Sequence, residues 1–99
     1  MAVAGLIVLA SPAHAQGPAG LYKAKCQVCH GPDGKGNTPA GVKLKVPDFH
    51  SPEVATMSDS AFTAAIKNGK GKMQAYSAQL TAAQITSLVK YIRSLIAIG

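Results

Sequence analysis

The sequence predicts an all-α domain with three main helices and one long loop. Three observations lead to this fold class. Residues 85–96 carry a continuous apolar stripe with the period of a helix, and residues 58–68 begin and end on helix signals. No segment alternates apolar and polar residues in the way that a half-buried strand would. We therefore expect helices without a sheet and without internal repeats.

The N-terminal segment differs from the rest of the chain and predicts a signal peptide. Residues 2–10 form an apolar run that is too short to span a bilayer as a helix. A small-x-small pattern that ends at Ala15 follows, which is typical of a cleavage site. No Lys or Arg precedes the apolar run, so the segment is either an atypical signal or an uncleaved anchor. We expect residues 1–15 to direct export to the periplasm and residues 16–99 to form one domain.

The first helix and the long loop follow this segment. Gly17-Pro18 can open a helix that continues into Cys26, because a proline fits the first helical position. Residues 31–52 are rich in Gly, Pro and charge and have no regular period, which indicates a loop. Loops of this length are uncommon in small domains and are usually functional. Wrapping around a cofactor would account for this one.

Two further helices have clear start signals. Ser58 can cap the first of them, and Gly69 follows its last residue. The last helix begins with a capping box from Thr81 to Gln84, in which each residue can satisfy a free backbone donor of the other. Its apolar stripe over residues 85–96 predicts a face that packs on the rest of the domain.

The motif with the clearest chemistry is Cys26-Gln-Val-Cys29-His30, a C-x-x-C-H sequence typical of c-type haem attachment. Two cysteines on one helical turn can each add to a haem vinyl group and form a thioether. The histidine that follows then lies under the ring, where its imidazole can bind the iron at high effective concentration. The motif therefore predicts one covalent haem c with His30 as an iron ligand.

Two other uses of a cysteine pair fit less well. A disulfide redox pair of the thioredoxin kind lies at a strand-to-helix junction of an α/β fold, and this sequence offers no strands. A zinc site needs a fourth ligand, and the second Cys/His pair that usually supplies it is absent from the sequence.

Composition narrows the class of partner. The formal net charge of +6 favours an acidic partner, an anionic lipid or nucleic acid. The chain has no Trp, three Tyr and two Phe, so bases would find few rings on which to stack, and we expect no nucleic acid. Membrane association is expected only if the N-terminal segment stays attached, because no other apolar stretch is long enough to span a bilayer.

The second axial position of the iron has four possible states, namely Met57, Met73, His50 or no protein ligand. Met57 directly precedes a helix cap, where a core-packing side chain is usual. His50 stands in the long loop and is expected to be solvated. Met73 stands in a polar stretch off any apolar stripe, where a thioether has no obvious core role. The pattern favours Met73 and leaves the others open.

In these motifs the chain resembles the class I cytochromes c, in particular the small single-haem bacterial type. The matching features are Tyr22, the C-x-x-C-H-Gly core, the Gly34-Lys-Gly36 loop, the Met73 segment, and Leu88-Val-Lys-Tyr91, whose aromatic packs on the first helix in the family. The resemblance implies the cytochrome c fold, with the long loop wrapped around the haem, and His30 and Met73 as iron ligands. It also implies electron transfer and not catalysis, because His/Met ligation fills both axial positions.

The resemblance adds details about single residues. Gln74 stands where the family usually has a proline, which leaves the Met73 segment less stiff. Pro39 matches a position whose carbonyl, in small relatives, accepts the second imidazole proton of the ligand histidine. The family fold would also gather Lys25, Lys70 and Lys72 near the exposed haem edge, where they could steer a redox partner with an acidic docking surface.

Three functions remain to be compared. The leading one is a periplasmic electron carrier. The alternative is a haem subunit of a dehydrogenase or terminal oxidase complex, and a third is a catalytic or ligand-sensing haem protein with a labile sixth ligand. The first two are not enzymes in themselves.

Overall fold

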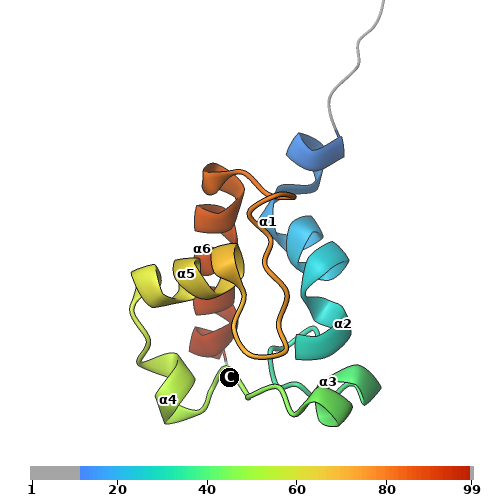
Figure 1. The fold of residues 1–99 in the computed structure, drawn as a ribbon, viewed down its shortest axis with the longest axis vertical. Coiled ribbons are helices and arrows are strands. Elements are labelled where there is room, and N and C mark those ends of the chain that lie inside the picture. Colours follow the sequence, from blue (N-terminus) through green and yellow to red (C-terminus); the bar gives the residue numbers. More distant parts are fainter. Residues whose placement is uncertain (1–11, 99) are drawn as a thin grey trace, which may run out of the picture.

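The structure, a computed structural model, describes residues 12–98. Over this range the chain is helical, with turns and loops between the helices and no strand (Figure 1). The helices are α1 (Pro12–Lys25), α2 (Gln27–His30), α3 (Pro39–Leu44), α4 (Pro52–Ala55), α5 (Asp59–Asn68) and α6 (Ala82–Ile98). The all-α prediction is confirmed. Most of the predicted signal peptide, residues 1–11, lies outside the described residues, and its cleavage stays a prediction.

A glycine divides α1 into two parts. The backbone of Gly17 has φ 63° and ψ −175°, outside the helical region, and glycine adopts a positive φ without strain. Pro18 then restarts the helix at a position where its missing N–H is not needed. The helix that leads into Cys26 therefore begins where the Gly-Pro pair predicted it.

The caps of α5 and α6 confirm two predicted helix starts. Ser58 Oγ accepts a hydrogen bond from the Ala61 N–H at 3.1 Å. At the start of α6 the Thr81 N–H donates to Gln84 Oε1 at 2.8 Å, and the Gln84 N–H donates to Thr81 Oγ1 at 3.1 Å. Both patterns satisfy backbone donors that have no partner within the helix.

The prediction of one uninterrupted loop over residues 31–52 is wrong, because α3 forms inside it. Thr38 caps this helix by accepting from the Gly41 N–H at 2.9 Å, and Pro39 is its first residue. A helix of six residues is too short to show a period in the sequence. The Thr-Pro pair was the only local signal of it.

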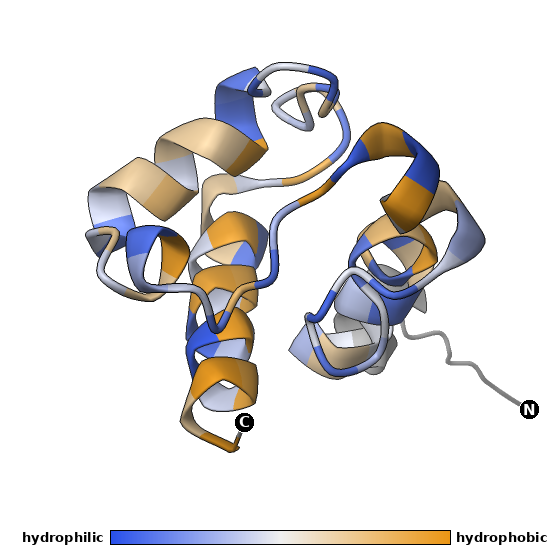
Figure 2. Ribbon diagram, turned by 90° about the horizontal axis from the view of Figure 1, so that it is seen from below, coloured by the Kyte–Doolittle hydropathy of each residue, from blue (hydrophilic) through white to orange (hydrophobic). Residues whose placement is uncertain are grey.

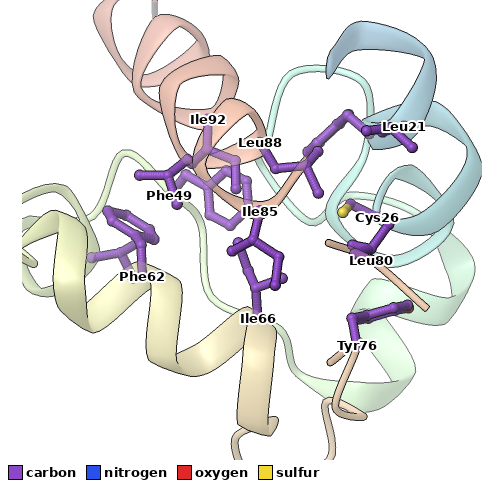
Figure 3. Packing of buried hydrophobic residues seen from close by; sticks show 13 residues of the cluster. Leu21, Cys26, Phe49, Phe62, Ile66, Tyr76, Leu80, Ile85, Leu88 and Ile92 are labelled. Carbon is purple, nitrogen blue, oxygen red and sulfur yellow. The ribbon is translucent and has the colours of Figure 1, made fainter. Parts of the chain in front are cut away.

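The core lies where α6 packs against α1 and α5 (Figures 1 and 3). Leu88 of α6 is 0% exposed and Tyr22 of α1 is 1% exposed. The rings of Tyr22 and Tyr91 lie 5.2 Å apart between centroids at an interplanar angle of 47°, which is the contact implied by the resemblance. Figure 2 shows the apolar residues of α6 recurring along the helix. None of the helices between residues 12 and 98 is long and apolar enough to cross a membrane.

Arg93 joins α6 to the junction between α4 and α5. Its guanidinium donates to Asp59 Oδ1 at 2.9 Å, to the Ala55 carbonyl at 3.1 Å and to the Met57 carbonyl. The same group lies 4.6 Å from the centroid of the Phe62 ring. Met57 is half-buried and packs against the core. These contacts agree with the prediction that Met57 has a structural role.

His50 joins the segment before α4 to the C-terminal part of α6. Its Nδ1 lies 2.7 Å from Asp48 Oδ1, and its Nε2 lies 3.0 Å from the Leu95 carbonyl oxygen. The side chain is 16% exposed, so the prediction of a solvated residue is wrong. Both ring nitrogens face acceptors, and only the protonated imidazole donates from both. The side chain of Asp48, and then the backbone of Leu95, raise the pKa of His50, which the charge of Lys35 opposes.

We expect this His50 bridge to lose its stabilising effect as the solution becomes alkaline. The folded-state pKa lies above the ordinary value of about 6.5, so the contribution is complete below that value and disappears as pH rises through the folded-state pKa. For Asp48, the backbone N–H of His50 and then its side chain lower the pKa. The contribution of Asp48 is therefore lost in acid, as pH falls through its folded-state pKa.

The measurement is the urea midpoint of the parent and of His50→Gln at about pH 5.5 and about pH 8.5, on either side of the usual histidine range. The two proteins should differ more at the lower pH. Thr56→Ala, at an exposed site beside α4, serves as the control with no titratable group. A difference that is the same at both pH values would show that protonation of His50 is not involved.

Candidate haem site

The two cysteines of the C-x-x-C-H motif (Cys26 to His30, the haem motif) lie on the single turn of α2. Cys26 is the N-cap residue, and its carbonyl accepts from the Cys29 N–H at 3.3 Å and the His30 N–H at 3.0 Å. Both cysteines are free thiols. Cys26 is buried, and burial raises its pKa to about 11, while Cys29 is half-buried. The turn therefore presents two thiols beside one imidazole.

Tyr22 holds the chain at the end of this turn. Its hydroxyl donates to the Gly31 carbonyl at 2.7 Å in a buried hydrogen bond. Desolvation raises the pKa of Tyr22, so the hydroxyl stays neutral and keeps its proton. The residue that matched the family on sequence thus fixes the backbone directly after His30.

The close approach of α3 braces the haem motif from the other side. A Cβ on Gly41 would lie 2.2 Å from the Cys29 carbonyl oxygen and 2.6 Å from that of Gly36, so only glycine fits. Thr38 Oγ1 donates to the Val28 carbonyl at 2.7 Å. The short α2 has few internal hydrogen bonds, and α3 supplies part of what it lacks.

The imidazole of His30 packs face to face with Phe49. The ring centroids are 4.6 Å apart and the planes differ by 26°. Burial lowers the pKa of His30, which favours the neutral imidazole that binds metals. In the part of the chain that the structure describes, His30 Nδ1 is buried and has no hydrogen-bond partner.

The implied hydrogen bond from His30 to the Pro39 carbonyl is therefore absent, and that expectation is corrected. As the first residue of α3, Pro39 has its carbonyl directed along the helix axis towards the following turn. The ring of His30 is positioned by its contact with Phe49 instead.

Phe49 is a site residue that sequence reasoning missed. It is 6% exposed, and its N–H donates to the Gly34 carbonyl at 2.9 Å. A Cβ on Gly34 would lie 2.5 Å from Phe49 Cδ2, so the loop after His30 closes directly on the ring. The only sign of this role in the sequence was a large apolar residue within a polar loop. Met73 was singled out by the same kind of pattern.

Met73 lies on the α5–α6 loop (residues 69–81), which connects the two helices in Figure 1 and contacts the end of α1 at Lys25. It is half-buried and packs against the core, so the expectation that its side chain has no core role is wrong. Its N–H donates to the Lys70 carbonyl at 2.9 Å, and its carbonyl accepts from the Lys70 N–H at 3.1 Å. A Cβ on Gly69 would lie 2.7 Å from the Met73 carbonyl oxygen. This tight turn defines the backbone that presents the thioether.

The residues of α2 fit a covalently attached haem. Two free thiols lie on one turn, and a neutral imidazole with a buried, unpartnered nitrogen follows them. Residues 13–92 match the family described as cytochrome c oxidase, cbb3-type, subunit III. The chain belongs to this family of c-type cytochromes.

One solved structure supports the assignment independently. The KustC0563 c-type cytochrome has a TM-score of 0.73 and 30% sequence identity, over 80% of this chain and 96% of that chain. No curated protein matches the chain. The resemblance to class I cytochromes c and the all-α cytochrome c fold are thus confirmed. As a c-type cytochrome, the chain takes part in haem-based electron transfer, and its cofactor is covalently bound haem c with its iron.

Proposed function

We propose that this cytochrome is a periplasmic electron carrier with one haem, bound through Cys26 and Cys29 and ligated by His30 and Met73. The α2 turn carries the proposal, because it brings two free thiols and a neutral imidazole together. The chain contains two cysteines, the number that one haem c requires. The apolar run and small-x-small pattern before residue 16 support export.

The bound haem would supply a reversible one-electron iron couple. The protein side chains would tune it. Phe49 packs on the face of His30 and limits rotation of the ring, and burial keeps that imidazole neutral. Ligation of the iron by the Met73 thioether would raise its reduction potential. With both His30 and Met73 bound, the iron would have no position free for O₂ or peroxide, so electron transfer is favoured over catalysis.

A second candidate function is a haem subunit of a larger oxidase complex. The family description, which names a subunit of a cbb3-type cytochrome c oxidase, favours it. Size-exclusion chromatography of the protein from its native host separates the two candidates. A free carrier elutes at the size of one small chain, and a subunit elutes with its complex.

The proposed carrier would bind a redox partner through positive charge around the α5–α6 loop. Lys70 and Lys72 are exposed on both sides of the turn that ends at Met73. Lys25 is half-buried and donates from Nζ to Gln79 Oε1 at 3.2 Å, so its ammonium group also lies at this loop. An acidic surface on the partner would complement these three charges.

Electron transfer itself tests the function. The reduced native protein should pass an electron to an acidic partner protein, and Lys70→Glu with Lys72→Glu should slow this about tenfold at low salt. The difference should vanish above about 0.15 M salt, where the Debye length is about 8 Å. Lys23→Glu with Lys90→Glu, at exposed lysines on α1 and α6, makes the same change in net charge and is the control. Equal rates for the double variant and the parent at low salt would refute the docking role.

A further inference from the structure

One tyrosine hydroxyl connects the α5–α6 loop to the haem motif. Tyr76 Oη donates to the Lys25 carbonyl at 3.0 Å. Lys25 is the last residue of α1 and directly precedes Cys26. The hydrogen bond therefore links the loop that carries Met73 to the start of the turn that carries the haem cysteines. Figure 3 shows Tyr76 and Cys26 on the same side of the core.

Tyr76 is itself held firmly enough to transmit such a constraint. The residue is 8% exposed and belongs to the core cluster. Its N–H donates to the Ile66 carbonyl at 2.9 Å, and its carbonyl accepts from the N–H groups of Gln79 and Leu80, both at 2.9 Å. The side chain of Gln79 accepts the hydrogen bond from Lys25 Nζ, so two contacts join the loop to the end of α1.

The part of the loop around Met73 itself, residues 70–74, is held by fewer contacts than Tyr76. The Met73 backbone pairs with Lys70 within its own turn. Gly71 of that turn has φ 58° and open space around it, and Lys72 and Gln74 are exposed. Gln74 also lacks the fixed φ that a proline would impose. The first firm attachment after Met73 is therefore Tyr76.

We propose that the Tyr76 hydroxyl is a positioning group that keeps Met73 on the iron. By holding the α5–α6 loop against the haem motif, it opposes the outward movement of the loop that release of the thioether requires. In relatives, a proline directly after the methionine would restrain this loop through its fixed backbone angle. In this chain, the hydrogen bond from Tyr76 restrains the loop instead. This inference rests on the proposed ligation by His30 and Met73.

The test compares Tyr76→Phe with the parent and with Tyr91→Phe, using the haem-loaded ferric protein. Tyr76→Phe removes one hydroxyl and keeps the ring in the core, while Tyr91→Phe removes a hydroxyl elsewhere in the same core. The probe is cyanide, which binds ferric iron only after the methionine has left. Cyanide binding should be about three- to tenfold faster in Tyr76→Phe, as expected for the loss of one part-buried hydrogen bond, and unchanged in Tyr91→Phe.

A second readout follows the backbone directly. The Met73 amide hydrogen, which is bonded to the Lys70 carbonyl, should exchange faster in Tyr76→Phe than in the other two proteins. Unchanged cyanide binding and unchanged exchange in Tyr76→Phe would overturn the inference. Equal acceleration in both variants would overturn it too, since the cause would be general destabilisation. The ferric parent is measured first. If it lacks the weak red absorption band of methionine-ligated iron, the proposed ligation by Met73 is wrong, whatever the variants show.

Discussion

Cells that express Cys26→Ala or Cys29→Ala should contain little or no haem-loaded cytochrome, with the covalently loaded fraction reduced about tenfold or more. Each thioether needs its own thiol, and both thiols are free on the turn of α2. Loss of a thioether also removes the fixed geometry that gives His30 its high effective concentration at the iron. Val28→Ala is a matched control, because Val28 lies between the two cysteines and is 67% exposed.

The measurement is extraction with acidic acetone followed by intact mass. Haem should stay on the parent chain and on Val28→Ala. The mass of the native protein should equal one polypeptide plus one haem, and it also reports whether the chain was cleaved after Ala15. Free haem in the acetone phase of the parent would contradict covalent attachment, and a mass with two haems would contradict the proposed single site.

Replacement of Met73 by alanine should lower the reduction potential by on the order of 0.1 V, because a thioether favours reduced iron over the water or hydroxide that would replace it. The red absorption band of methionine-ligated iron should disappear as well. Met57→Ala should leave both properties unchanged. It should instead cost about 1–3 kcal/mol of unfolding free energy, below the full range for a buried methionine, because Met57 is only half-buried.

A spectroelectrochemical titration and a urea unfolding curve of the two variants provide the comparison. Met57 is a good control, since it has the same side chain and also packs against the core. The Arg93 guanidinium holds its backbone at the junction of α4 and α5. A lower potential in Met57→Ala with an unchanged potential in Met73→Ala would reassign the ligand.

Features with a local chemical signal could be predicted from the sequence. The caps at Ser58 and Thr81 form with partners three residues away, so a short stretch of sequence contains both groups of each cap. The haem motif is local in the same sense, because one turn contains both thiols and the imidazole.

Features that depend on distant partners could not be predicted. His50 was expected in solvent, yet its second acceptor is the carbonyl of Leu95, far along the chain on α6. Phe49 packs on His30 only after α3 has brought the loop back to the haem motif. A backbone carbonyl carries no residue-specific signal, so neither the Leu95 contact nor the position of the Pro39 carbonyl could be deduced from residue types.

The Tyr22 hydroxyl has a further consequence for how this cytochrome responds to its surroundings. Its bond to Gly31 uses a neutral donor whose pKa is raised further by burial, so this bond does not change over the pH range in which the His50 bridge gains or loses its proton. The two contacts therefore respond to pH differently. The contact of His50 with the C-terminal part of α6 weakens as pH rises. The hydrogen bond from Tyr22 to the backbone after the haem motif stays the same. A change of pH would then alter the folding stability of the domain without altering the hydrogen bond that holds the attachment turn.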